Sequence, residues 1–128
     1  MSYKYAIVGA TGNVGREILQ ILPERGVSVK DVVAVASSRS VGAEVSYGED
    51  EVLKIHELAS FDFEGTDIVL SSPGAKISKE YVPRATSVGA IVIDNTSQFR
   101  MDPDVPLVVP EVNPDAIAEF RNRNIIAN

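Results

Sequence analysis

Three glycines near the start of the chain have a spacing that suits the binding of an anion. The run GATGNVG places Gly9, Gly12 and Gly15 three residues apart, between the apolar run KYAIVG and the helical pattern of residues 13–22. In such a turn the first glycine permits the bend, the second leaves room for a ligand and the third allows close packing of the helix, whose N-terminus attracts negative charge. The context favours a dinucleotide pyrophosphate, although the commoner motif is GxGxxG and a tight turn alone also needs glycine.

A second polar group, ASSRS at residues 36–40, indicates which dinucleotide to expect. Enzymes that use NAD commonly present an acidic residue to the ribose at the end of the second strand, and this stretch contains none. Ser38, Arg39 and Ser40 instead offer hydroxyls and a guanidinium, which suit the 2′-phosphate of NADP. Arg39 would also be unremarkable as a surface residue, but its place after a strand favours phosphate contact. The sequence therefore predicts NADP rather than NAD.

Two further polar runs, SSPGAK from Ser71 and DNTSQFR from Asp94, follow later expected strands. The carboxyl ends of parallel strands form the edge at which open α/β sheets bind ligands. We expect Ser71, Gly74 and Asn95 to line the cofactor, with plain turns as the alternative. Arg100 could hold a phosphate or carboxylate of a substrate, or lie free on the surface.

The chain offers few other groups for catalysis. It contains no cysteine, so it holds no thiol nucleophile and no thiolate metal site. His56 is the one histidine and has no evident acid–base partner, so we expect a structural role for it. The acidic residues lack the spacing of a metal site. We expect no catalytic residue and no metal site in residues 1–128.

Short apolar runs alternate with helical patterns, as in parallel βαβ units. Helices are expected at residues 13–22, from Ser78 to Gly89 despite Pro83, and from a cap at Asn113 to Arg121. The expected strands are KYAIVG, DVVAVASS, EVLKIHEL, TDIVLSS, AIVIDNTS, LVVPEV and NIIAN. We predict an α/β fold: a Rossmann-like, doubly wound, mostly parallel sheet with helices on both faces.

Composition sets limits on the class of protein. With 128 residues, 45% of them hydrophobic, the chain is expected to form one domain with its own core. The formal net charge of −6 argues against nucleic acid and anionic membranes as partners. No apolar stretch approaches the roughly 18 residues of a membrane span, and the first residues lack the pattern of a signal peptide. We therefore expect a soluble, cytoplasmic protein.

Five stretches closely resemble the amino-terminal domain of the aspartate-semialdehyde dehydrogenases: AIVGATGNVGREIL, ASSRS, FEGTDIVLSSPG, GAIVIDNTSQFRMDPDVPLVVPEVN and IIAN. The resemblance covers almost the whole chain, and DNTSQFRMDPDVPLVVPEVN is its most specific part. It implies that Arg39 and Ser40 contact the 2′-phosphate and that Arg100 holds the phosphate of the substrate. It also implies a pyrophosphate loop formed by Thr11, Gly12, Asn13 and Val14.

The resemblance further implies an activity. The family interconverts β-aspartyl phosphate and aspartate 4-semialdehyde on the route to lysine, methionine and threonine: a cysteine thiolate displaces phosphate, and NADPH reduces the thioester. In the family that cysteine follows shortly after the run equivalent to IIAN, and a second domain completes the substrate site and most of the dimer interface. We thus expect residues 1–128 to be a truncated dinucleotide-binding domain, inactive alone, of a homodimer or dimer of dimers.

Two alternatives remain at this stage. A domain like that of the N-acetyl-glutamyl-phosphate reductases would share the fold, the cofactor and the thioester chemistry, although FRMDPDVPLVVPEVN argues against it. A non-catalytic Rossmann module that senses NADP would account for the absence of a nucleophile.

Overall fold

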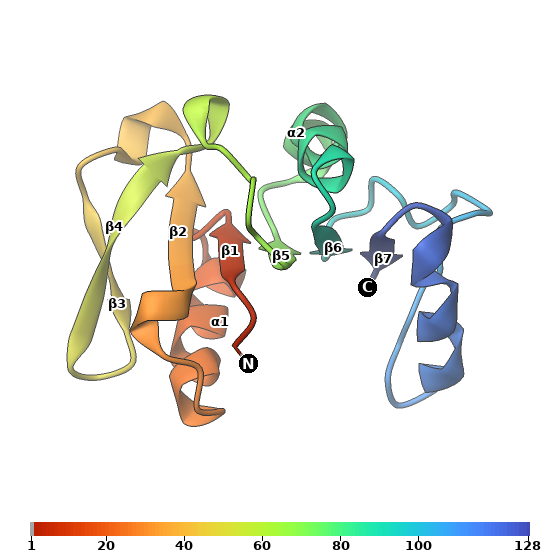
Figure 1. Ribbon diagram of the computed structural model, residues 1–128, viewed down its shortest axis with the longest axis horizontal. Coiled ribbons are helices and arrows are strands. Elements are labelled where there is room, and N and C mark those ends of the chain that lie inside the picture. The colour runs from red at the N-terminus through yellow and green to blue at the C-terminus, as the bar shows by residue number, and fades with distance from the viewer. Residues whose placement is uncertain (1) are drawn as a thin grey trace.

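The computed structural model describes residues 2–128, which form one seven-stranded sheet of order β3-β4-β2-β1-β5-β6-β7 (Figure 1). All neighbouring strands are parallel except β3 and β4, which form an antiparallel hairpin at one edge. The strands are β1 (Tyr5–Val8), β2 (Val32–Ala36), β3 (Glu44–Tyr47), β4 (Glu51–Glu57), β5 (Ile68–Ser71), β6 (Ile91–Asp94) and β7 (Ile125–Ala127). The predicted Rossmann-like sheet is confirmed.

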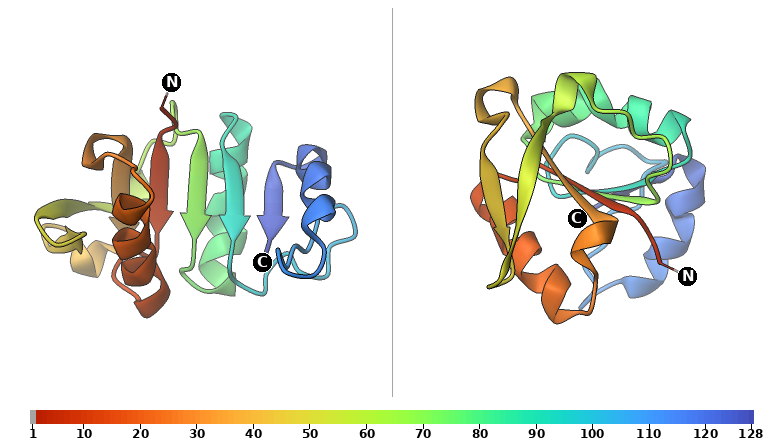
Figure 2. Two further views of the ribbon diagram at one scale, coloured as in Figure 1. Left: turned by 90° about the horizontal axis from the view of Figure 1, so that it is seen from below. Right: turned by 60° about the vertical axis from the view of Figure 1, so that its left-hand side comes forward.

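Two α-helices, α1 (Asn13–Glu24) and α2 (Ala75–Ser87), lie on opposite faces of the sheet (Figures 1 and 2). Leu19 and Leu22 of α1 pack on one apolar cluster with Ile7 and Val32, whereas Tyr81 of α2 belongs to a second cluster on the other face. Burial of both faces explains why the central strands are almost continuously apolar. The 3₁₀ segments are η1 (Val29–Asp31), η2 (Ser38–Ser40), η3 (Leu58–Ser60) and η4 (Pro114–Asn122).

The second helix begins earlier than predicted. It starts at Ala75 after Gly74, whose φ of 102° is a conformation that glycine adopts readily, and Ser78 is buried inside the helix instead of capping it. The helix also continues through Pro83. Pro83 has no N–H to donate to the carbonyl of Lys79, one turn earlier. Both residues are exposed, so water can bond to that carbonyl instead.

Two predictions for the last third of the chain were wrong in detail. LVVPEV forms no strand beyond a single bridge between Leu107 and Ala127, because prolines at 106 and 110 cannot donate to a ladder. The helix after Asn113 is a 3₁₀ helix, and the Asn113 side chain does not cap it. That side chain instead accepts from Val109 N and donates to Leu107 O, both at 2.8 Å.

Candidate functional site

The glycine turn between β1 and α1 lies tightly against the connection between β5 and α2. Gly9 has a φ of +86°, and a Cβ built there would lie 2.9 Å from the carbonyl carbon of Ser72 and 3.0 Å from the nitrogen of Pro73. Gly9 N also donates to Val35 O at 3.0 Å, which ties the turn to β2. The chain itself therefore requires glycine at this position.

Gly15 and Gly12 differ in what demands them. A Cβ on Gly15 would lie only 2.2 Å from Gly9 O, so the close approach of α1 to the turn excludes any side chain. A Cβ on Gly12 would meet only Gly9 O, at an ordinary contact distance of 3.5 Å, and the Gly12 φ of −80° suits any residue. Gly12 therefore leaves space in front of the helix that no protein atom needs.

The N-terminus of α1 faces this space with unused donors. The first intrahelical bond runs from Arg16 N to Gly12 O at 3.0 Å, so the N–H groups of Asn13, Val14 and Gly15 precede it. The first turn of the helix carries no acidic residue. The helix dipole and these donors favour an anion at this end.

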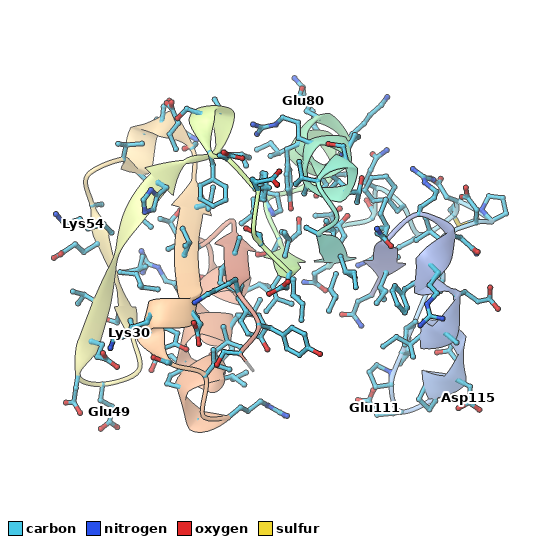
Figure 3. The ribbon with its side chains drawn as sticks, in the orientation of Figure 1. Lys30, Glu49, Lys54, Glu80, Glu111 and Asp115 are labelled. Atoms are coloured by element: carbon cyan, nitrogen blue, oxygen red, sulfur yellow. The ribbon has the colours of Figure 1, made fainter. Side chains whose placement is uncertain are left out.

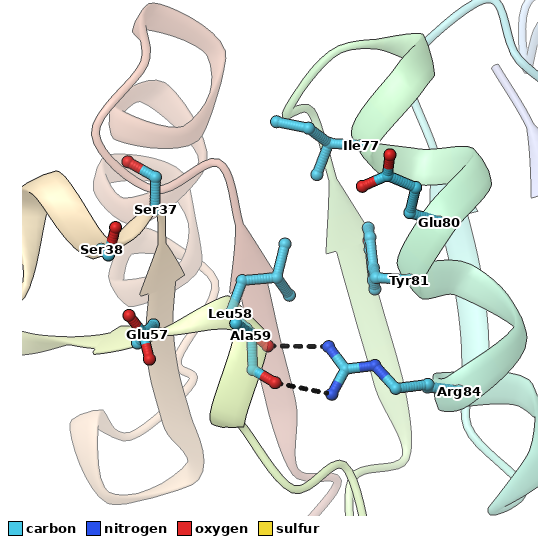
Figure 4. Close-up of a pocket in the computed structure, with 9 residues that line it drawn as sticks. All are labelled: Ser37, Ser38, Glu57, Leu58, Ala59, Ile77, Glu80, Tyr81 and Arg84. Atoms are coloured by element: carbon cyan, nitrogen blue, oxygen red, sulfur yellow. Dashed lines mark hydrogen bonds between the residues drawn. The ribbon is translucent and has the colours of Figure 1, made fainter.

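Two adjoining cavities lie at the carboxyl ends of the central strands. The smaller, of about 250 Å³, includes Gly9, Thr11, Gly12 and Arg39 in its lining, and the larger, of about 400 Å³, lies between η3 and α2 (Figure 4). Both cavities share Ser37, Leu58 and Ile77. Because the two linings overlap, a single elongated ligand could occupy both cavities. Of the charged residues labelled in Figure 3, Glu80 lies beside the larger cavity and the others lie on other parts of the surface.

Arg39 is held at the cavity by the short η2 segment. Ser40 N donates to Ser37 O at 3.0 Å and closes the turn, while the Arg39 side chain stays exposed. Among residues 2–128 no carboxylate pairs with this guanidinium. It remains available to a phosphate.

Glu57 was not singled out from the sequence. The register of β2 and β4 sets Ala36 opposite Glu57, and this brings the carboxylate to the larger cavity beside Ser37 and Ser38. Ser60 Oγ donates to Glu57 Oε1 at 3.2 Å. ASSRS contains no acid, but a neighbouring strand supplies one, and only the pairing of β4 with β2 reveals it.

Ser71 lies behind the site in a buried polar network. Its hydroxyl is 3.2 Å from that of Ser78, which donates to Asp94 Oδ1 at 3.0 Å, and Thr96 Oγ1 donates to Asp94 Oδ2 at 2.6 Å. Both Ser71 and Asp94 are fully buried, and the following residue, Ser72, lines the smaller cavity instead. The network joins β5, α2 and the loop after β6.

The aromatic ring of Tyr81 borders the larger cavity, and its hydroxyl is buried with no hydrogen-bond partner among residues 2–128. Burial raises the pKa of this phenol above its usual range, and the nearby Ser71 hydroxyl acts in the opposite direction. Tyr81 therefore stays neutral at physiological pH.

Arg100 is held by two backbone carbonyls. Its Nη2 donates to Asn95 O at 3.0 Å and its Nε to Asn128 O at 3.2 Å, which links the loop to the ends of β6 and β7. The nearby acids Asp102 and Asp104 pair instead with Arg123, at 2.9 and 3.1 Å. Among residues 2–128 no side-chain carboxylate pairs with Arg100.

The predicted site residues fall into separate groups. Thr11, Gly12 and Arg39 share the smaller cavity, while Asn95 and Arg100 lie farther along the edge, at β6. His56 is exposed on β4, 6.0 Å from the Phe61 ring centroid, and lines neither cavity. The part of the chain from residue 2 onward contains no cluster of metal ligands and no helix long and apolar enough to cross a membrane.

Comparison with known proteins adds independent information. Residues 4–120 match the family described as semialdehyde dehydrogenase, NAD binding domain. The chain is 50% identical to the aspartate-semialdehyde dehydrogenase of Rickettsia conorii over 98% of its own length and 37% of that protein. The chain thus spans less than half the length of this curated relative.

Solved structures agree with the same fold. Aspartate semialdehyde dehydrogenase II of Vibrio cholerae, complexed with ASA, superposes with a TM-score of 0.92 at 47% identity and covers all of this chain and 42% of its own. The Candida albicans enzyme, solved with NADP, gives a TM-score of 0.77 at 26% identity, over 99% of this chain and 42% of its own.

Proposed function

The chain belongs to the NAD-binding domain family of the semialdehyde dehydrogenases, and from that premise we propose that it holds NADP for the reduction of aspartyl phosphate by a longer enzyme. One observation carries the proposal. The smaller cavity is lined by Gly12, which directly precedes the unused N–H groups of α1, and by Arg39, which pairs with no carboxylate among residues 2–128. These are the features that a phosphorylated dinucleotide needs.

The residues present fit NADP from end to end. The unused N–H groups of the loop from Thr11 to Gly15 would hold the pyrophosphate, in the space that Gly9 and Gly12 leave, since the N–H groups of these two glycines are bonded within the turn. Ser38, Arg39 and Ser40 would hold the 2′-phosphate. The adenine would lie between the apolar side chains of Leu58 and Ile77, which line both cavities. Gly74 and Asn95 would border the nicotinamide end, whereas Ser71 would support that wall from behind. When bound, NADPH supplies the hydride.

Arg100 suits the phosphate of the substrate in this proposal. Two main-chain oxygens hold its guanidinium, and no side-chain carboxylate among residues 2–128 pairs with it, so it can present a fixed positive charge. Its attachment to Asn95 keeps it near the proposed nicotinamide end and away from the 2′-phosphate region. The ligands of the longer enzyme would be aspartyl phosphate, aspartate semialdehyde and phosphate.

The choice of NADP over NAD is open to a direct test. Arg39→Ala removes one charge-assisted contact worth about 1.5 to 3 kcal/mol, so NADP should bind about ten- to a hundredfold more weakly while NAD changes by less than about twofold. Calorimetric titration of the 128-residue chain measures both constants. Arg25→Ala, at the opposite end of α1, is the matched control. Equal losses for the two cofactors would contradict the assignment, since Arg39 would then contact a part that NAD and NADP share.

Catalysis would belong to the longer enzyme. The relatives reported above are aspartate-semialdehyde dehydrogenases of more than twice this length, which supports a second domain that supplies the cysteine and most of a dimer interface. They also favour this enzyme over an N-acetyl-glutamyl-phosphate reductase. We expect no NADP reduction by the purified 128-residue chain with aspartate semialdehyde and phosphate; turnover that survives repurification would contradict this. A cytoplasmic location fits such a biosynthetic role.

A further inference from the structure

Arg84, in the last turn of α2, reaches across to the segment that follows β4 (Figure 4). Its Nη2 donates to Leu58 O at 2.7 Å, and its Nη1 donates to Phe61 O at 3.3 Å and to Ala59 O at 3.4 Å. The guanidinium carbon also lies 5.6 Å from the centroid of the Phe63 ring. One side chain thus satisfies three carbonyls of a single short segment.

This link connects the two walls of the larger cavity. Leu58 forms one wall, and Ile77 and Tyr81, spaced along the same face of α2 as Arg84, form the other. Ile77 keeps 36% of its surface exposed although it is apolar, and it borders both cavities. An apolar side chain left open at a cavity gains from a flat apolar ligand.

The other polar contacts of residues 58–61 are local. Phe61 N donates to Leu58 O at 3.3 Å, and Ser60 Oγ reaches only as far as Glu57. Leu58 and Phe61 pack on the core cluster, yet apolar packing tolerates sliding more readily than directed hydrogen bonds do. The hydrogen bonds that join this segment to α2 all come from Arg84.

We propose that Arg84 is a positioning residue, which holds Leu58 at the distance from Ile77 that lets both touch the adenine ring of the bound dinucleotide. This inference rests on the proposed function. Dispersion attraction falls steeply with separation, and a gap of about 0.5 to 1 Å already loses about a quarter to a half of a contact. A small outward shift of the segment would therefore weaken adenine binding without altering the glycine turn.

Two substitutions separate the hydrogen bonds from the rest of the side chain. Arg84→Met keeps an unbranched apolar stem beside Phe63 and removes every donor. Arg84→Lys keeps the charge, but a single ammonium cannot match the planar fork that reaches several carbonyls at once. Arg121→Met is the matched control, because Arg121 also lies over an aromatic ring, 5.3 Å from the centroid of Phe120, and touches neither cavity.

The experiment compares a ligand that contains adenine with one that lacks it. The ¹⁵N-labelled 128-residue chain is titrated with NADP, with 2′,5′-ADP and with inorganic pyrophosphate, and the amide signals of the glycine turn report binding. Arg84→Met should weaken NADP and 2′,5′-ADP about five- to twentyfold, with Arg84→Lys intermediate. Pyrophosphate should change by less than about twofold, because its contacts lie on the glycine turn. Arg121→Met should leave all three constants unchanged.

Two results would overturn the inference. Unchanged binding of 2′,5′-ADP by a folded Arg84→Met chain would mean that Arg84 does not control the cavity. An equal loss for pyrophosphate would mean that the substitution disturbs the whole edge of the sheet. Failure of the unsubstituted chain to bind NADP would instead contradict the proposed function, and this inference with it.

Discussion

The two halves of the ligand-binding edge are built differently. Around β1, β2 and β4 the described residues leave cavities, unused N–H groups and an arginine, Arg39, that pairs with none of their carboxylates. Around β6 and β7 the polar groups are bonded to the protein itself, since Arg100 holds Asn95 and Asn128, and Asp94 holds Thr96 and Ser78. We expect the first half to bind a ligand by itself, whereas hydrogen bonds within the second half hold Asn95 and Arg100 in place. Substitutions in the first should change affinity, and those in the second should change stability or turnover.

The largest effects are expected for two substitutions in the glycine turn. They separate a residue needed for stability from one needed for ligand binding. Gly15→Ala puts a methyl group 2.2 Å from Gly9 O and should cost about 3 kcal/mol or more of unfolding free energy. Gly12→Ala meets only an ordinary contact, so stability should change by less than about 1 kcal/mol while NADP binding is lost. Urea denaturation and calorimetry measure the two quantities. A large loss of stability for Gly12→Ala would show that the space in front of α1 serves folding.

Asp94 is the corresponding test in the second half. Asp94→Ala leaves the buried hydroxyls of Ser78 and Thr96 without their acceptor and should lower the unfolding free energy by about 2 to 4 kcal/mol. Thr96→Val is the milder partner, since it removes one donor and leaves Asp94 bonded to Ser78. The two changes should be strongly non-additive in a double-mutant cycle. Additive effects would mean that the network does not act as one unit.

Arg100→Lys tests whether the second half of the edge contributes to substrate binding or turnover in the full-length enzyme. A lysine cannot bond two carbonyls and grip a phosphate in a fork, so the KM for phosphate should rise about tenfold, or kcat should fall if the contact strengthens in the transition state. The Kd for NADP should stay within about twofold. Steady-state kinetics with phosphate varied, beside a cofactor titration, measure both. Weaker NADP binding with an unchanged phosphate dependence would assign Arg100 to the first half of the edge.

The smallest effect is expected at Arg123, which follows η4 and contacts the loop after β6. It pairs with Asp102 and Asp104, and these half-exposed contacts should contribute no more than about 1 kcal/mol. Arg123→Met should therefore destabilise the chain slightly, and added salt should reduce the difference. A loss that persists in high salt would point instead to the packing of Arg123 on the ring of Phe99, 5.5 Å from its centroid.

Local sequence patterns were sufficient to predict most of the fold. The alternation of KYAIVG, the glycine turn and the α1 pattern is confined to about twenty residues, so it can be recognised without knowledge of any distant contact. The start of α2 could not be read in this way, because Ser78 resembles a cap until its partner Asp94 is known to lie beneath it. β3 was missed for a similar reason, since it is short and pairs only with β4.

In the candidate site too, some residues could be placed from local sequence and others only from contacts between distant segments. Arg39 and the glycines follow their strands directly, so sequence position alone brought them to the edge. Ser71 was predicted to line the cofactor, but it is buried, and the next residue, Ser72, lines the smaller cavity. Successive side chains along an extended strand point to opposite faces, so a shift of one residue changes the face. Glu57 reaches the cavity only through the crossover that pairs β4 with β2. Neither relation is present in any short stretch of sequence.

The bridge between Leu107 and β7 has a consequence for self-association. Ala127 N donates to Pro106 O at 2.9 Å and Val108 N donates to Ala127 O at 2.8 Å, so this short segment occupies the outer groups of the last strand. Prolines at 106 and 110 flank it and cannot extend a ladder to another molecule. The segment thus covers the outer edge of β7 and removes a template for edge-to-edge aggregation. Because it does not form a full strand, it presents no new edge of its own.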